Sequence, residues 1–247
     1  MKKILAVDVG GSKVKLLASG ETEPRKVASG PDLTPARMVE KVRKAARGWR
    51  YDAVSIGLPA MVGPAGPLAE PGNLGPGWVG FDFAAAFDCP VRIANDAAMQ
   101  ALGSYDGGRM LFLGFGTGLG SALIAEHVIL PLELGELPLR DASFSAIFGR
   151  EAFEKDGKKA WRKRVVRTLP ALQKAFMADY VVVGGGNAKH LRKKLPAGVR
   201  VGNNLNALRG GFRLWGIEEV QTLHEEGTAP KTLARPVGSA NGEWRVL

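Results

Sequence analysis

The chain has 247 residues, of which 45% are hydrophobic and 23% are charged, and its formal net charge is +10. This composition is typical of a globular protein with one large domain or two small ones, and the basic balance favours anionic partners. A single cysteine excludes a disulfide framework and a cysteine-rich zinc site, and no apolar stretch is long enough to cross a bilayer. We therefore expect a cytoplasmic protein.

The first half of the chain predicts alternating strands and helices. Two apolar runs, 4–9 and 14–18, flank a glycine turn and predict a β-hairpin. Apolar residues at helical spacing predict an amphipathic helix over 35–49. The next expected elements are a strand over 53–58, an ordered Pro- and Gly-rich loop over 59–80, a short helix over 81–87 and a strand over 91–94.

The second half opens with the same pattern of strand, glycine turn and strand, over 110–125. This recurrence favours a duplicated fold with a cleft between two lobes. The further expected elements are a helix over 158–176 that Pro170 kinks or divides, a strand over 180–183 followed by a helix, and a short helix over 206–215. Residues after Glu225 are polar and interrupted by Pro and Gly, which predicts a loosely held tail.

The first glycine turn lies in Asp8-Val9-Gly10-Gly11-Ser12, and Lys15 follows it. The two glycines let main-chain N–H groups approach an anion without a Cβ in the way. Lys15 adds positive charge, and Asp8 can hold Mg²⁺ through water. A plain hairpin turn is the alternative interpretation.

The second glycine turn lies in 114–121, where four glycines alternate with other residues between two apolar strands. A strand rather than a helix follows, so the segment is not a dinucleotide fingerprint. Glycine weakens a strand interior, and a phosphate cradle around Gly116, Thr117 and Gly118 explains the alternation better.

Asn95 and Asp96 directly follow the strand expected over 91–94. A carboxylate at a strand end can accept the proton of a substrate hydroxyl as that hydroxyl attacks phosphorus. The pair is also a good helix N-cap signal, so both interpretations stay open.

Three consecutive glycines, Gly184, Gly185 and Gly186, follow an apolar strand. They can present a flat surface to a nucleotide base or ribose. A simple strand-to-helix turn explains them equally well.

In this order and spacing, these motifs resemble those of the ROK family of sugar kinases and sugar-responsive repressors, and most of all its polyphosphate glucokinases. The similarity covers roughly residues 4–216. Beyond the motifs above, it rests on two segments, Asn73-Leu74-Gly75-Pro76-Gly77-Trp78 and Glu133-Leu134-Gly135-Glu136.

The resemblance implies an α/β protein with the actin-like ATPase (ribonuclease H-like) fold, in which two lobes flank a central cleft. We expect an N-terminal lobe over 1–105 with the first phosphate hairpin and the catalytic aspartate. A C-terminal lobe over 106–205 would carry the second hairpin and the nucleotide-side glycines. Residues 206–247 would form a terminal helix and a flexible tail.

The resemblance also implies a hexose kinase that transfers a phosphoryl group from polyphosphate, ATP or both to a sugar hydroxyl, with glucose 6-OH as the expected acceptor. Asp96 would be the general base. The implied sugar-binding residues are Asn73, Asn95, Asp96, Glu133 and Glu136. The implied phosphate-binding residues are Gly10, Gly11, Ser12, Lys15, Gly116, Thr117 and Gly118.

The implied nucleotide-side residues are Gly184, Gly185 and Gly186, and Asp8 would hold Mg²⁺ through water. Members of the family are usually dimers, so we expect a homodimer. Zinc, nucleic acid and membrane are not expected as partners.

One departure from the family pattern stands at Glu136, where the family commonly has histidine. Histidine can donate or accept a hydrogen bond, whereas an ionised carboxylate only accepts. The change predicts an altered sugar pocket. The cysteine cluster of the zinc-binding members is also missing, as it is in polyphosphate glucokinases.

Two rival hypotheses come from the same family. A repressor would carry a helix-turn-helix before the kinase-like part, and only three residues precede the first expected strand. A catalytically impaired sugar- or nucleotide-binding protein is the second, and Glu136 supports it. Asp8, Lys15, Asp96 and both glycine hairpins favour the enzyme.

Overall fold

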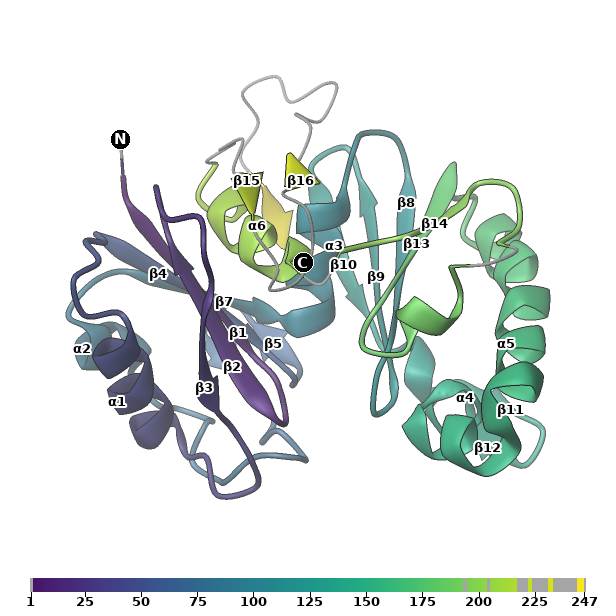
Figure 1. The fold of residues 1–247 in the computed structure, drawn as a ribbon, viewed down its shortest axis with the longest axis horizontal. Helices are drawn as coiled ribbons and strands as arrows, with labels where there is room; N and C mark the ends of the chain where they lie inside the picture. The colour runs from purple at the N-terminus through teal and green to yellow at the C-terminus, as the bar shows by residue number, and fades with distance from the viewer. Residues whose placement is uncertain are drawn as a thin grey trace.

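The computed structural model of the chain describes residues 2–192, 195–203, 205–216, 222–223, 231–232 and 244–246. Within them, two sheets stand side by side, each with helices on its outer face (Figure 1). The expected α/β fold with two halves is thus confirmed.

The N-terminal sheet has the strand order β3-β2-β1-β4-β7. Its first three strands are antiparallel, and β1, β4 and β7 run parallel. Its strands are β1 (Ile4–Val9), β2 (Lys13–Ala18), β3 (Arg25–Ala28), β4 (Ala53–Leu58) and β7 (Val91–Asn95). The hairpin and strands expected here are confirmed.

The C-terminal sheet has the strand order β14-β13-β8-β9-β10-β17. Its central pair, β8 and β9, is the second glycine hairpin. Its strands are β8 (Met110–Phe115), β9 (Leu119–Ala125), β10 (Val128–Leu132), β13 (Tyr180–Gly184), β14 (Val199–Val201) and β17 (Arg245–Val246).

The side chains of β1 alternate between the two faces of the N-terminal sheet, and both faces are covered by helices. Leu5 and Val7 pack toward α1 (Pro35–Ala45) and α2 (Phe83–Phe87), whereas Ile4 and Ala6 pack toward α6 (Asn206–Arg213). Successive side chains of a strand point to opposite faces, so an uninterrupted apolar run fits a sheet buried on both sides.

The outer face of the C-terminal sheet is covered by α5 (Arg150–Ala175), which follows the short α4 (Phe144–Phe148) (Figure 1). The buried side chains Trp161, Val165 and Leu169 of α5 are four residues apart and form one helix face.

The expected break at Pro170 is wrong. Pro170 lies inside α5 and is exposed, and the non-helical residue is instead Gly157, with φ of +77°. Water can hydrogen-bond the carbonyl group that an exposed proline leaves unpaired. A positive φ, by contrast, favours glycine.

The helix expected after the triple glycine is only a 3-10 turn, η2 (Ala188–His190). Gly185 has φ of +80°, and the main-chain N–H of Asn187 donates to the carbonyl of Phe115 at 3.0 Å. These contacts fold the segment back against the end of β8.

Two helices, α3 (Asp96–Ser104) and α6, lie between the sheets. They cross in backbone contact, because a Cβ on Gly103 would clash with the Asn206 carbonyl and one on Gly210 with the Met99 carbonyl. The buried Arg213 of α6 donates to the carbonyls of Leu102 and Tyr105 at the end of α3.

The remaining described elements are short. They are β5 (Val62–Gly63), β6 (Gly66–Pro67), η1 (Leu134–Glu136), β11 (Pro138–Leu139), β12 (Ala142–Ser143), β15 (Thr222–Leu223) and β16 (Lys231–Thr232). Most of the tail expected after Glu225 lies outside the described residues, although β17 pairs with β10. In the described parts of the chain, no helix combines the length and apolarity that a membrane span requires.

Candidate active site

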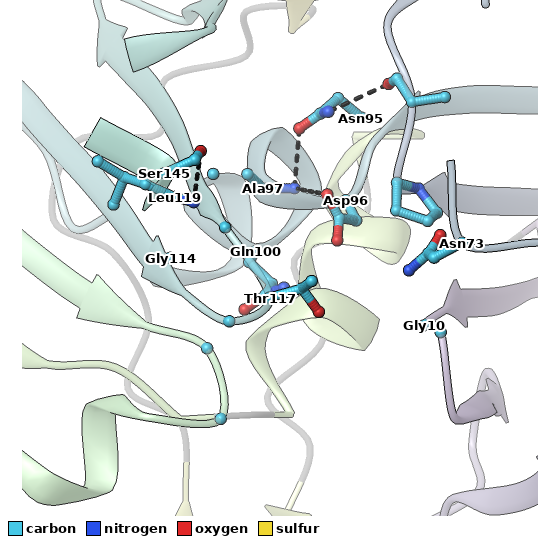
Figure 2. Close-up of a pocket in the computed structure, with 18 of the residues that line it drawn as sticks. Gly10, Asn73, Asn95, Asp96, Ala97, Gln100, Gly114, Thr117, Leu119 and Ser145 are labelled. Carbon is cyan, nitrogen blue, oxygen red and sulfur yellow. Dashed lines mark hydrogen bonds between the residues drawn. The ribbon is translucent and has the colours of Figure 1, made fainter. Parts of the chain in front are cut away.

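A cavity of about 610 Å³ opens between the two sheets (Figure 2). Of the residues predicted to form a site, all line this cavity except Ser12 and Gly184. The predicted residues that line it are Asp8, Gly10, Gly11, Lys15, Asn73, Asn95, Asp96, Gly116, Thr117, Gly118, Glu133, Glu136, Gly185 and Gly186.

Asn95 caps helix α3, which leaves the carboxylate of Asp96 facing the cleft. The Asn95 side-chain oxygen accepts hydrogen bonds from the N–H groups of Ala97 at 2.9 Å and Ala98 at 3.2 Å. Its amide nitrogen donates to the Ala60 carbonyl at 3.1 Å, so one of its two amide hydrogens stays available. Asn95 is therefore the N-cap residue of α3, and the Asp96 carboxylate is not needed for that role.

Asp96 lies close to both sheets. A Cβ on Gly57 of β4 would lie 3.6 Å from the Asp96 Cα, and one on Gly120 of β9 would lie 2.9 Å from the Ala97 Cβ. Glycine at these two positions lets the start of α3 fit between the sheets. The result is a carboxylate at the floor of the cleft (Figure 2).

The surroundings of Asp96 raise its pKa to about 7. Burial is the largest cause, because removal from water disfavours the charged form. The nearby carboxylates of Asp8 and Glu133 raise the pKa further, while the hydrogen bond from the Ala97 N–H, at 2.8 Å, opposes the rise. A pKa near neutrality suits a general base.

Asp8 and Lys15 face each other across the first hairpin. They are direct partners in the β1–β2 register, and their side chains form an ion pair at 3.2 Å. Asp8 is only 7% exposed but still lines the cleft. Both predicted charges of this hairpin thus reach the cavity.

Both glycine turns offer unpaired main-chain N–H groups. Within the described part of the chain, the N–H groups of Gly11, Thr117, Gly118 and Gly186 make no hydrogen bond. Such N–H groups, clustered around a cavity, can bind an anion. Gly184, in contrast, does not line the cavity, although a Cβ there would lie 2.6 Å from the ring of Phe112, which does.

Glu133 precedes the short η1 turn and Glu136 is its last residue, and both line the cleft. The turn is held by the Ser121 hydroxyl, which accepts from the Leu134 N–H at 3.1 Å and donates to the Leu132 carbonyl at 2.7 Å. Burial raises the pKa of Glu133, and the neighbouring Glu136 carboxylate adds to the rise. The two carboxylates therefore lie close enough to interact.

No protein-family model matches the sequence. A curated relative, a polyphosphate glucokinase of Mycobacterium leprae, is 28% identical over 211 residues, which are 78% of this chain. The chain spans 62% of that protein, less than two thirds of its length.

Solved structures match the fold over most of the chain. The inorganic polyphosphate/ATP-glucomannokinase of Arthrobacter sp. strain KM superposes with a TM-score of 0.69 at 20% identity, covering 85% of this chain and 96% of that one. A ROK family glucokinase of Streptomyces griseus, in complex with glucose and AMPPNP, gives 0.67 at 16% identity, covering 84% and 97%. The chain is thus similar in sequence to polyphosphate glucokinases and has the fold of solved ROK family proteins.

The structural matches confirm the expected fold class. The matched structures include ROK hexokinases and glucokinases, which carry the actin-like ATPase fold of two α/β lobes. The lobe boundaries and the role of each site residue stay predictions.

Several residues that line this cleft were not predicted. Arg150, Ser145, Gln100 and Met61 all line the cavity. Arg150 and Ser145 belong to the α4–α5 segment, which lies far from the glycine motifs in the sequence and has no recognisable motif of its own. Only the fold places them beside Thr117 and Gly118.

Proposed function

We propose that the protein is a hexose kinase that transfers a phosphoryl group from polyphosphate, ATP or both to a sugar hydroxyl, with glucose 6-OH as the acceptor. The observation that carries this proposal is the position of Asp96. Its carboxylate, with a pKa near 7, lies in one cleft with two glycine turns that have unpaired N–H groups.

In the proposed reaction, the sugar lies between Asp96 and the polar side chains of Asn73, Asn95, Glu133 and Glu136. Asp96 accepts the proton of the attacking hydroxyl as its oxygen bonds to phosphorus. The N–H groups of Gly11, Thr117 and Gly118 bind the donor phosphates and stabilise the charge that develops there. The remaining donor leaves with the electron pair of the broken P–O bond.

Asp8 fits a magnesium site of the kind that needs one carboxylate and the substrate phosphates. It is an oxygen donor at the edge of the proposed phosphate site. The described residues hold no group of three or more His, Cys, Asp or Glu that could bind a metal by itself. Bound Mg²⁺ would neutralise phosphate charge, and Asp8 would hold it through water.

The donor is proposed from the relatives and from surface charge. Polyphosphate glucokinase and polyphosphate/ATP-glucomannokinase are the names of two matched proteins. Six Lys or Arg residues and no acidic residue lie between 158 and 167 on α5. A long polyanion contacts charges well beyond the cleft, whereas ATP contacts only those within it.

The sugar is proposed from the glucokinase names and from the complex of the Streptomyces griseus enzyme with glucose. In this chain Glu136 lines the cleft, and a sugar bound beside its carboxylate would give a different preference among hexoses. We also propose a cytoplasmic homodimer that binds neither zinc, nucleic acid nor membrane.

A coupled assay over a panel of hexoses, each with ATP and with polyphosphate, tests this function. We expect sugar-dependent consumption of at least one donor. If sugars bind but no donor is consumed under any condition, the protein is a catalytically impaired binding protein, and the kinase proposal is wrong.

A further inference from the structure

The cleft contains two cationic side chains among the described residues, and they differ in their surroundings. Lys15 is paired with Asp8 at 3.2 Å. Arg150 lines the same cavity and is exposed, and it has no ion pair and no side-chain hydrogen bond within the described part of the chain. A cation that faces a cleft without a protein partner is available to a ligand.

The main chain of Arg150 is held against the second glycine turn. Its N–H donates to the Thr117 carbonyl at 3.2 Å, and the preceding Gly149 donates to Ser145 at 2.8 Å. Any side chain at Gly149 would clash with the Thr117 carbonyl, so glycine is required for this approach. The Ser145 hydroxyl in turn accepts from the Leu119 N–H at 3.2 Å.

Hydrogen bonds from two α5 side chains also hold the main chain just before Arg150. The Trp161 indole N–H donates to the Phe148 carbonyl at 2.8 Å, and Arg164 donates to the Ile147 carbonyl at 2.8 Å. Trp161 belongs to α5 and is fully buried in the same apolar cluster as Phe148 of α4. The base of the Arg150 side chain therefore has a fixed place beside the Thr117 and Gly118 N–H groups.

We propose that Arg150 binds the donor phosphate group held by the second glycine turn. A guanidinium group has five N–H donors in a rigid plane and can bind two phosphate oxygens at once. It would supply positive charge from the C-terminal sheet, whereas Lys15 supplies it from the N-terminal sheet. This assignment rests on the proposed kinase function.

The test compares Arg150→Gln and Arg150→Lys with Lys155→Gln. Lys155 is an exposed cation on the first part of α5 that does not line the cleft, so its variant removes one charge nearby without touching the site. Binding of tripolyphosphate and of glucose is measured by calorimetry, and kcat and KM are measured with ATP and with polyphosphate.

We expect Arg150→Gln to weaken tripolyphosphate binding at least about tenfold and to lower kcat about 10²-fold, as for loss of a group that stabilises developing charge. Glucose binding should stay unchanged. Arg150→Lys should recover part of the affinity but less of kcat, because an ammonium group lacks the planar fork. Lys155→Gln should resemble the wild type.

Tripolyphosphate affinity of Arg150→Gln within twofold of the Lys155→Gln value would overturn the assignment. A wild-type protein that consumes no donor would instead contradict the kinase function. The binding comparison would still decide in that case whether Arg150 holds phosphate.

Discussion

The two glycine hairpins, β1–β2 and β8–β9, have the same shape but obtain their charge differently. The first carries its own charges, because Asp8 and Lys15 are register partners on its two strands. The second carries none between Met110 and Ala125. Among the described residues, the cation that lies beside this hairpin in the cleft is Arg150, from the distant α4–α5 segment. A duplicated backbone motif therefore need not have duplicated chemistry.

The carboxylate between the two hairpins gives the largest expected effect. Asp96→Asn should lower kcat by about 10²–10⁴-fold, because an amide keeps the shape but cannot take the hydroxyl proton. Sugar affinity should stay near the wild-type value. Steady-state kinetics and calorimetry measure both, with the exposed Asp141→Asn as the control. Near-normal turnover would mean that Asp96 is not the base.

Alanine substitutions separate the roles of the two hairpins. A Cβ on Gly11 would lie 2.6 Å from the Asn73 amide, and one on Gly118 would lie 2.9 Å from the Ser145 hydroxyl. We expect Gly11→Ala to raise KM for the sugar and Gly118→Ala to raise KM for the donor, each about tenfold.

Gly72 provides the control, because it does not line the cavity and a Cβ built there meets no other part of the structure within 4 Å. Gly72→Ala should change both KM values less than twofold. If Gly11→Ala and Gly118→Ala affect sugar and donor equally, the two hairpins do not divide the substrates between them.

The basic residues of α5 lie beyond the second hairpin and should act only on a long donor. Neutralising Arg162, Lys163 and Arg167 together should raise KM for polyphosphate several-fold and leave KM for ATP nearly unchanged. The difference should vanish with added salt, since the Debye length falls from about 10 Å at 0.1 M to about 3 Å at 1 M. If KM for polyphosphate and KM for ATP change equally at low salt, this helix face does not bind polyphosphate.

The smallest expected effect is a pH-dependent change in Tm. The pKa of Asp96 is raised in the folded state from the usual 3.8 to about 7, so between these two values only the unfolded state releases the proton. The stability of the folded protein is therefore lost as pH rises from the lower value to about 7, and the loss is complete above it. Asp96→Asn mimics the protonated form. Its Tm should exceed that of the wild type at pH 8, and the difference should shrink at pH 5. A constant difference between the two pH values would contradict the raised pKa.

The strands and the cleft could be predicted because their signals are local. Apolar runs such as Ile4–Val9 mark strands, and glycines beside them mark the turns. The non-helical Gly157 lies directly before the helix expected over 158–176, which agrees with that prediction. The continuation of the helix through Pro170 could not be predicted, because it depends on this residue lying on the exposed face.

The site was predictable to the extent that its residues lie in their own motifs. The first hairpin contains Asp8 and Lys15, and Asp96 directly follows strand β7. All three residues line the cleft. Arg150 and Ser145 reach it only because Gly149 lets their segment approach Thr117. Ser12 and Gly184 belong to the right motifs, but the cavity does not include them.

The glycine contact between α3 and α6 has a mechanical consequence. The side chains of α3 pack mainly on the C-terminal sheet and those of α6 on the N-terminal sheet, so the two halves bear on each other where Gly103 and Gly210 cross. Two helices in backbone contact at one point can rotate about that point but cannot move closer together. If the cleft narrows around a substrate, the two halves must therefore rotate about this crossing. Asp96, at the start of α3, then travels less than the tips of the two hairpins, and the donor is brought to the base.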